Sequence, residues 1–177
     1  MCNREIFAPD EQKLMNINKD WTRDELLNQE AIFFLKDVAK ALCFDVLPLK
    51  SVAIRLANSG QDPWQTMGAA RIFQHWVLRM TVFSVWYRNT ILYKVRKPEK
   101  NWDGRQMLQA KGIFLLKDVC AVMPLSSQQI CAQIRKDPGN ARSILGVWKD
   151  EQTGVYLAEM EILAAWIRET WGDLIPS

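Results

Sequence analysis

Few side chains in this sequence of 177 residues combine the types and spacing that catalysis or metal binding requires. His75 is the only histidine, no Ser or Cys has a base partner nearby in the sequence, and no Gly-rich phosphate-binding loop occurs. The cysteines form no Cys-x-x-Cys pair, so we expect reduced, buried thiols and no metal site; they are Cys2, Cys43, Cys120 and Cys131. We therefore expect a protein that is not an enzyme and needs no cofactor.

Two short segments carry side chains that suit a different chemistry, hydrogen bonding to DNA bases. In the first, Lys50 and Arg55 match the acceptors of guanine, and Ser51 can bond to several base groups. The second holds three amide side chains that suit adenine, namely Gln128, Gln129 and Gln133. The alternative for each of these residues is an ordinary solvated position on a helix.

Further basic side chains are placed where they could contact phosphates or the minor groove. Arg71 and His75 accompany one expected hairpin tip, and Arg142 and Lys149 accompany a second. The stretch 94–101 adds cations that could follow the DNA backbone, namely Lys94, Arg96 and Lys97. A solvated hairpin and a soluble linker would explain the same residues without DNA.

The helices and strands expected to carry these residues occur twice, because the sequence contains an internal duplication. Residues 19–38 and 100–119 are identical at nine of 20 positions with a constant offset of 81. The matched pairs along the chain include Trp21 and Trp102, Gly68 and Gly146, and Trp86 and Trp166. Small changes in the offset fall in loops, as they do between true structural repeats.

Each repeat is predicted to run helix, short apolar strand, helix, turn, helix, hairpin and helix. The capping box Thr22-x-x-Glu25 starts a helix over about residues 23–30. Apolar residues with helical spacing predict the next helix over 35–42, and 116–123 repeat that pattern. The turn that follows is expected to hold Pro48 in the first copy and Pro124 in the second.

The second half of each repeat is predicted from caps and from β-prone runs. Ser126 or Ser127 caps a helix over 128–135. The runs 144–148 and 154–157 flank a polar turn and predict a hairpin, with a tighter version around 71–75 in the first copy. Closing helices are expected over 79–89 and 159–170. Four tryptophans are expected in the cores, namely Trp76, Trp86, Trp148 and Trp166.

This order of elements resembles the MerR/excisionase branch of winged helix-turn-helix DNA-binding domains. The similarity rests on Phe114-Leu-Leu-Lys-Asp-Val-Cys-Ala-Val-Met through Trp166, with a "Leu-x-x-Trp-Ile" motif in the last helix. The sequence departs from MerR proteins in lacking a long coiled-coil helix after the motif and an effector-binding cysteine pattern. The resemblance implies a mainly α fold with short β-hairpin wings (α+β), whose second helix enters the major groove.

The expected domain organisation is an N-terminal arm (1–18), repeat 1 (19–93), a basic linker (94–101) and repeat 2 (102–177). The arm is either flexible or a dimer contact. Acidic residues near the second hairpin leave two alternatives open: repeat 2 mediates self-association or partner binding while repeat 1 reads DNA, or both repeats bind DNA. No apolar run approaches the ~20 residues of a membrane span, and no signal peptide is evident, so a cytoplasmic, nucleoid-associated location is expected.

The expected function is sequence-specific binding of double-stranded DNA by a regulator of bacterial or phage type, or by a replication or recombination accessory factor. Two tandem motifs could read half-sites about one helical turn apart, either as a covalent pseudo-dimer or in a homodimer. The alternative is a protein-interaction or scaffold module built from degenerate winged helices.

Overall fold

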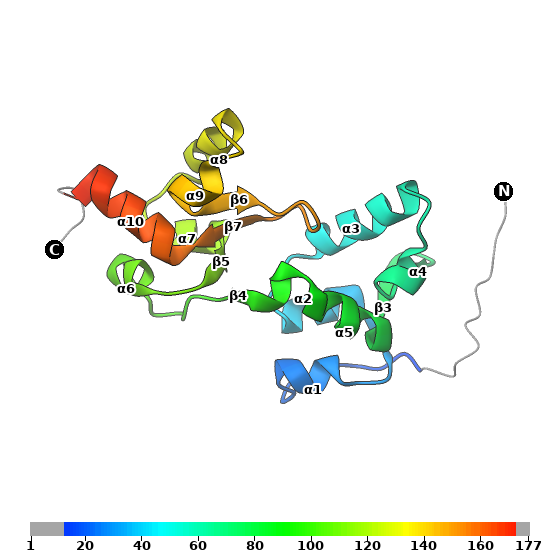
Figure 1. Cartoon of the computed structure of the whole chain (residues 1–177). Coiled ribbons are helices and arrows are strands. Elements are labelled where there is room, and N and C mark those ends of the chain that lie inside the picture. Colours follow the sequence, from blue (N-terminus) through cyan, green and yellow to red (C-terminus); the bar gives the residue numbers. More distant parts are fainter. Residues whose placement is uncertain (1–12, 173–177) are drawn as a thin grey trace. The chain divides into compact units, whose positions relative to one another are not determined.

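The computed structural model describes residues 13–172 and shows a mixed α/β chain that divides into two compact units, Met1–Asn89 and Thr90–Ser177. Figure 1 labels the elements of both units. Unit 1 contains α1 (Arg23–Leu27), β1 (Ile32–Phe34), α2 (Leu35–Ala41), α3 (Val46–Asn58), α4 (Pro63–Thr66), β2 (Ala69–Ile72), β3 (His75–Arg79) and α5 (Met80–Asn89). Unit 2 contains a 3-10 turn (Ile91–Lys94), β4 (Val95–Arg96), α6 (Gly104–Gln109), β5 (Ile113–Leu115), α7 (Leu116–Val122), α8 (Ser127–Lys136), α9 (Ala141–Leu145), β6 (Val147–Lys149), β7 (Tyr156–Glu159) and α10 (Met160–Trp171).

Each unit holds one small sheet, and the two sheets share strand order and register. The order is β1-β3-β2 in unit 1 and β4-β5-β7-β6 in unit 2. In both, the hairpin is antiparallel and its second strand also pairs with the short strand before the second helix. The corresponding pairs are Ile32–Arg79 with Ile113–Glu159, and Ala69–Leu78 with Val147–Ala158.

The segments expected to be an arm and a linker also contribute strand pairing. Leu14 forms a parallel bridge to Ile32, and Val95 pairs in parallel with Ile113. Both partners in the second pair stand 81 positions after their counterparts in the first. Leu14 and β4 therefore extend the sheets of the two units at equivalent positions, outside the repeats predicted over 19–93 and 102–177.

Buried glycines close each hairpin against the last helix of its unit. Gly68 and Gly146 have φ of 71° and 68°, a left-handed conformation that favours glycine. A Cβ added at Gly68 would lie 2.5 Å from the carbonyl oxygen of Arg79, and one at Gly146 would lie 2.7 Å from that of Glu159. The N–H of Arg79 donates to the carbonyl of Gly68, and the N–H of Glu159 donates to the carbonyl of Gly146, each at 2.7 Å. Only glycine permits this approach.

Local signals explain where the first helix of each unit begins. Thr22 accepts from the N–H of Glu25 while the Glu25 carboxylate accepts from the N–H of Thr22, which confirms the predicted capping box. Asp103 and Gln106 form the same reciprocal pair at the start of α6. The predicted helix was too long in unit 1, because α1 ends at Leu27.

Pro48 does not lie in a turn, as the sequence had predicted. It occupies the first turn of α3, where a missing N–H removes no intrahelical hydrogen bond, so the helix begins before the proline. Pro124 does lie in the turn between α7 and α8. The third helix of unit 1 is therefore longer at its start than its counterpart in unit 2.

Two short helices, α4 and α9, were not predicted. The run 144–148 was predicted as a strand, but Ile144 and Leu145 belong to α9 and the strand begins only at Val147. Gly146 in the left-handed conformation ends α9 and separates the helix from the strand. The apolar run alone does not reveal this break, because a short apolar segment fits helix and strand equally well.

The core of unit 2 is a cluster of buried apolar side chains drawn from α6–α10 and the sheet. Of the four tryptophans expected in the cores, Trp86 is buried at 9% exposure, while Trp76, Trp148 and Trp166 are only half-buried. The thiols also differ from expectation, since Cys43 is exposed and Cys120 and Cys131 are half-buried. Cys2 lies outside the described residues. Within residues 13–172, none of the helices has the length and apolar character needed to cross a membrane.

Candidate nucleic-acid interface

Helix α8 presents a polar face. Its N-cap is Ser126, whose hydroxyl accepts from the N–H of Gln129 at 3.3 Å, so the predicted cap is confirmed. Ile130 and Ile134 are buried and hold the helix against its unit. The residues predicted to contact bases are all exposed, namely Gln128, Gln129 and Gln133. The helix therefore offers three amide side chains to a partner without disturbing the core.

Two exposed cations at the end of α8, Arg135 and Lys136, were not singled out from the sequence. They occupy its last turn, where the partial negative charge of the helix C-terminus favours them. The signal was present in the sequence, because a basic pair at the end of an amphipathic helix is recognisable. Arg135 was already the last residue of the helix predicted over 128–135, and Lys136 lies one residue beyond it.

The hairpin of unit 2 carries two cations stacked on aromatic rings. The guanidinium of Arg142, from α9, lies 4.2 Å from the centre of the Trp148 ring. The ammonium of Lys149 lies 5.8 Å from the centre of the Tyr156 ring on the paired strand. These contacts hold both exposed cations beside β6 and β7. Arg142 is therefore brought to the hairpin by α9 and not by a strand.

The tip of this hairpin is closed by acidic and hydroxyl groups. The Asp150 carboxylate accepts from the N–H of Thr153 at 2.8 Å and from its hydroxyl at 2.5 Å. The N–H of Gly154 donates to the carbonyl of Asp150 at 2.7 Å. With exposed Glu151 beside it, the tip is acidic, and a phosphate would be repelled there.

Helix α3 mixes polar and apolar side chains on its outer face. Ser51 and Arg55 are exposed, while Lys50 is half-buried. Leu47 and Ile54 are 73% and 50% exposed, and they stand seven positions apart, on one side of the helix. Unit 1 therefore brings its three predicted base-contacting residues onto one helix, but beside an apolar stripe that the sequence analysis did not single out.

The hairpin of unit 1 has a short apolar tip. Arg71 lies in β2 and His75 in β3, both exposed, so they flank the tip and do not form it. The loop is Phe73-Gln74, because Ile72 pairs with His75. Phe73 is 93% exposed, and its φ of 51° is in the left-handed region. The His75 ring lies 5.5 Å from the ring of Phe34, in an edge-on arrangement.

The cations of the expected linker lie away from the hairpin of unit 2. Arg96 is on β4, at the sheet edge opposite β6. Its guanidinium donates to the carbonyl of Lys111 at 2.8 Å and lies 5.9 Å from the Phe114 ring centre. Exposed Lys94 and Lys97 stand on either side of this strand. The structure therefore does not bring these three residues together with the α9–β6 cations.

A carboxylate belongs to this opposite edge as well. The N–H of Gly112 donates to Glu161 at 2.9 Å and, with smaller contributions from Lys111 and Arg96, holds the pKa of the Glu161 carboxyl below its ordinary value of 4.5. Glu161 is therefore ionised at neutral pH and offsets the neighbouring cations. This edge is less positive than its basic residues alone would suggest.

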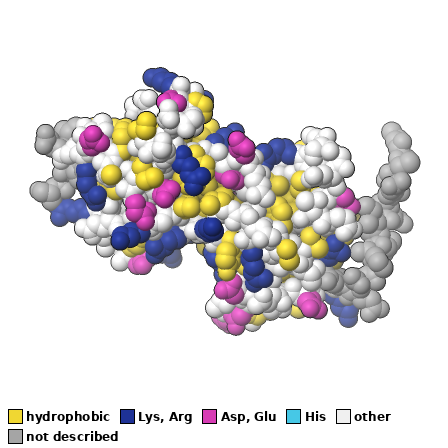
Figure 2. Space-filling model, viewed as in Figure 1, with side chains coloured by type: hydrophobic (Ala, Val, Ile, Leu, Met, Phe, Trp, Pro, Cys, Tyr) yellow, Lys and Arg dark blue, Asp and Glu magenta, His cyan; other side chains and the backbone are white. Residues whose placement is uncertain are grey.

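Charges of both signs are mixed on the surface. Figure 2 shows Lys and Arg side chains interspersed with acidic ones on the face in view, with apolar atoms reaching the surface between them. The formal net charge of +3 is small. The surface in view therefore lacks the single large basic field that would bind any polyanion, and DNA contact would depend on the placement of particular side chains.

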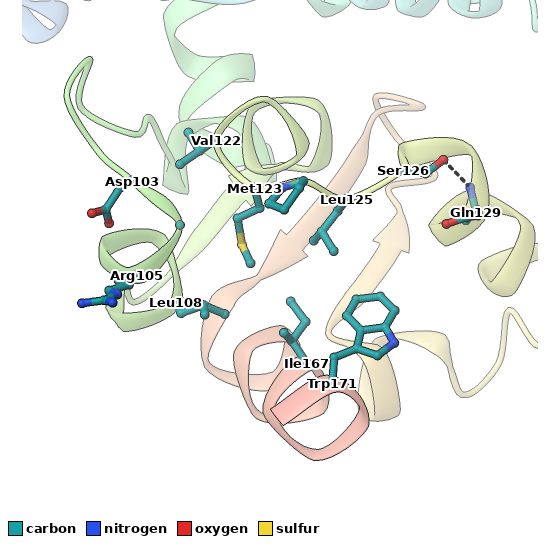
Figure 3. Close-up of a pocket in the computed structure, with 12 residues that line it drawn as sticks. Asp103, Arg105, Leu108, Val122, Met123, Leu125, Ser126, Gln129, Ile167 and Trp171 are labelled. Atoms are coloured by element: carbon teal, nitrogen blue, oxygen red, sulfur yellow. Dashed lines mark hydrogen bonds between the residues drawn. The ribbon is translucent and has the colours of Figure 1, made fainter. Parts of the chain in front are cut away.

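A cavity of about 540 Å³ opens in unit 2, beside the N-terminal end of α8. Figure 3 shows Leu108, Met123, Leu125, Ile167 and Trp171 around the space between α6, the α7–α8 turn and α10. Gln129 is at its rim, so this predicted base-contacting residue borders the cavity as well as solvent. The lining is mostly apolar.

Within residues 13–172, no three His, Cys, Asp or Glu side chains come close enough together to hold a metal ion. No model of a protein family matches the chain, and neither a curated protein nor a solved structure does.

Proposed function

We propose that the chain is a tandem pair of winged helix-turn-helix domains that binds double-stranded DNA, as a regulator or as an accessory factor of replication or recombination. The observation that supports this most is the recurrence in both units of helix, strand, helix, turn, helix, hairpin and helix with one strand register. The equivalent glycines and equivalent edge strands add to it. In this arrangement the second helix of each motif, α3 or α8, enters the major groove.

The exposed face of α8 suits base reading. Gln129 and Gln133 are four positions apart and so lie on one face, and an amide bonds adenine through paired donor and acceptor groups. The first N–H groups of the helix present partial positive charge toward an approaching phosphate. Arg135 and Arg142 would add backbone contacts, since cations position a protein on DNA without reading sequence.

The face of α3 suits reading of a different kind. Arg55 and Lys50 can bond guanine, and the apolar side chains of Leu47 and Ile54 can pack against thymine methyl groups. Two unlike helices predict an asymmetric binding site, with half-sites of different sequence. On this proposal both units contact DNA, and the protein is associated with the nucleoid of the cell that makes it.

The test is selection of bound duplexes from a random pool, followed by fluorescence anisotropy of the full chain with the recovered sequence at several salt concentrations. We expect affinity to fall linearly with the logarithm of salt concentration, because cations on the protein release counterions from DNA. Gln129→Ala with Gln133→Ala should weaken binding by about 1–3 kcal/mol per lost base contact and relax specificity in one half-site. Recovery of no enriched sequence, with no salt dependence of binding, would refute the proposal.

Two controls keep this test specific. Gln109→Ala removes an exposed amide of α6 in the same unit and should leave affinity unchanged. Exchanging the cations of α3, as Lys50→Arg with Arg55→Lys, keeps the charge and changes the geometry. A loss of specificity with an unchanged salt slope would assign these two residues to base edges and not to phosphates.

The second candidate function, protein interaction, is favoured by one observation. Among the large apolar side chains that are exposed within residues 13–172, all but Ile144 belong to unit 1, including Leu47 and Ile54 on α3. An apolar helix face of this kind packs against a protein more readily than against phosphates. The charge pattern had instead suggested unit 2 for a partner. Sedimentation of the Leu47→Ser, Ile54→Ser variant distinguishes the two: a change in oligomeric state with unchanged DNA affinity favours protein interaction.

A further inference from the structure

The tip of the unit 1 hairpin combines three features that the proposed base-reading helices do not use. Phe73 is 93% exposed, the most exposed of the large apolar side chains within residues 13–172. Ile72 beside it is 47% exposed. Arg71 and His75 are exposed on the two strands that lead to the tip. The apolar tip is therefore bordered by two side chains that can form hydrogen bonds to phosphates or to base edges in a groove.

The tip is rigid. Ile72 and His75 are paired across the hairpin, so only Phe73 and Gln74 form the loop. Phe73 has a φ of 51°, at the first central position of a two-residue loop, where hairpin turns with positive φ favour glycine or asparagine. A phenylalanine held in this conformation is strained, and backbone strain of this kind is concentrated at functional sites. The side chain is thus presented outward by a backbone that has little freedom.

The hairpin and the helix proposed to read the major groove pack against the same two helices, α2 and α4. Helix α4 contacts both α3 and β2, and α2 contacts both α3 and β3. A duplex seated on α3 would therefore bring its flanking minor groove near this hairpin. The equivalent tip in unit 2 is closed by Asp150 and Thr153, and its one large apolar side chain, Val155, is half-buried.

We propose that Phe73 is a wedge that enters the minor groove beside the α3 half-site and partly unstacks one base step, kinking the duplex toward the major groove. This inference rests on the proposed function. Apolar side chains inserted in this way kink DNA by about 20–90°, and they favour flexible pyrimidine–purine steps such as TA. Arg71 and His75 then contact the groove walls. The kink lies on one side of the binding site only, because unit 2 has no wedge.

The experiment uses the full chain and the duplex recovered by selection, labelled at both ends for energy transfer and carrying 2-aminopurine at successive adenines. With the wild type we expect the ends to approach and 2-aminopurine fluorescence to rise at one step flanking the α3 half-site. Phe73→Ala should lose more than half of the bend and of the fluorescence rise, while affinity changes less than about 10-fold because the reading helices remain. Phe73→Leu should retain most of both signals, since leucine also serves as a wedge.

The matched control is Gln74→Ala, which alters the other loop residue and should leave the bend unchanged. Phe73→Ala that binds and bends DNA like the wild type overturns the wedge and leaves the proposed function intact. A wild type that binds no duplex overturns both. If Phe73→Ala changes the sedimentation of the free protein and not the bend, the side chain contacts a protein and the wedge is also refuted.

Discussion

Cys43 is placed in a backbone conformation that glycine adopts more easily. Its φ is 62°, immediately after the C-cap of α2. The N–H of Phe44 donates to the carbonyl of Ala39 at 2.8 Å, and the N–H of Cys43 donates to that of Lys40 at 3.2 Å. These two hydrogen bonds form a Schellman motif, which favours glycine at the position of Cys43.

We therefore expect Cys43→Gly to stabilise the protein by about 1 kcal/mol, because the strain of a left-handed side-chain residue is relieved. The exposed thiol makes only a 4.0 Å contact to the carbonyl of Ala41, so its loss costs little. Denaturant unfolding measures the change. Cys43→Ala keeps the strain and should not stabilise; equal stabilisation by both variants would contradict this explanation.

Glu161 links stability to pH. Its pKa is lowered below 4.5 in the folded chain, so the stabilisation it contributes is complete above that value and is lost as the pH falls through the folded pKa. Glu161→Gln keeps an acceptor for Gly112 but removes the charge. The wild type should exceed the variant in unfolding free energy at pH 7 by less than about 1 kcal/mol, because the site is exposed. The difference should shrink below pH 4.5, as measured by urea titrations across pH.

At the scale of elements, the junction of each hairpin with its last helix depends on one glycine. A Cβ at Gly146 would lie 2.7 Å from both the Glu159 carbonyl oxygen and the Leu163 nitrogen, in a residue whose φ is 68°. Backbone atoms cannot yield as a flexible side chain can. Gly68 meets the equivalent carbonyl, of Arg79, at 2.5 Å.

Gly146→Ala and Gly68→Ala should each destabilise the protein by more than about 3 kcal/mol, since strain and overpacking add. Gly60→Ala is the matched control, because Gly60 also has a left-handed φ of 81° but has no atom within 4 Å of the added Cβ. It should cost only about 1–2 kcal/mol. Thermal unfolding measures the stability of the three variants. A similar loss of stability in all three would show that backbone strain, and not the close contact of the added Cβ, causes the effect.

At the scale of the whole molecule, the division into two compact units has a consequence for folding and for binding. The buried core cluster of unit 2 consists of residues between Met107 and Ile167. The strands of the unit 2 sheet pair only with one another. A unit with its own core and its own sheet contains what it needs to fold alone.

We expect fragments 1–89 and 90–177 each to unfold cooperatively in calorimetry. On the proposed function, the two mixed fragments should bind the selected duplex at least about 100-fold more weakly than the intact chain, because linkage raises the effective concentration of the second unit. Equal affinity of one fragment and the whole chain would assign all DNA contact to that unit. A fragment that does not fold would contradict the independence of the units.

Features encoded by near neighbours were predictable from the sequence alone. The capping box at Thr22 and the cap at Ser126 satisfy N–H groups three residues away, and the spacing of Leu35, Val38 and Leu42 defines one buried helix face. The similarity between the regions around Trp21 and Trp102 predicted which positions of the two units correspond. Polar residues of α8 were correctly expected to be exposed, because the intervening isoleucines must be buried.

Strand pairing and burial could not be predicted in this way, because both depend on partners that are distant in the sequence. Nothing local shows that Leu14 and Val95 pair with strands 18 residues later, so an arm and a linker were predicted where a β-bridge and the strand β4 exist. Burial, which separates the exposed Leu47 and Phe73 from apolar residues in the core, also depends on what packs against them. Local patterns in the sequence predicted helices, their caps and two hairpins, whereas contacts between distant residues set which segments join each sheet and which apolar side chains stay exposed.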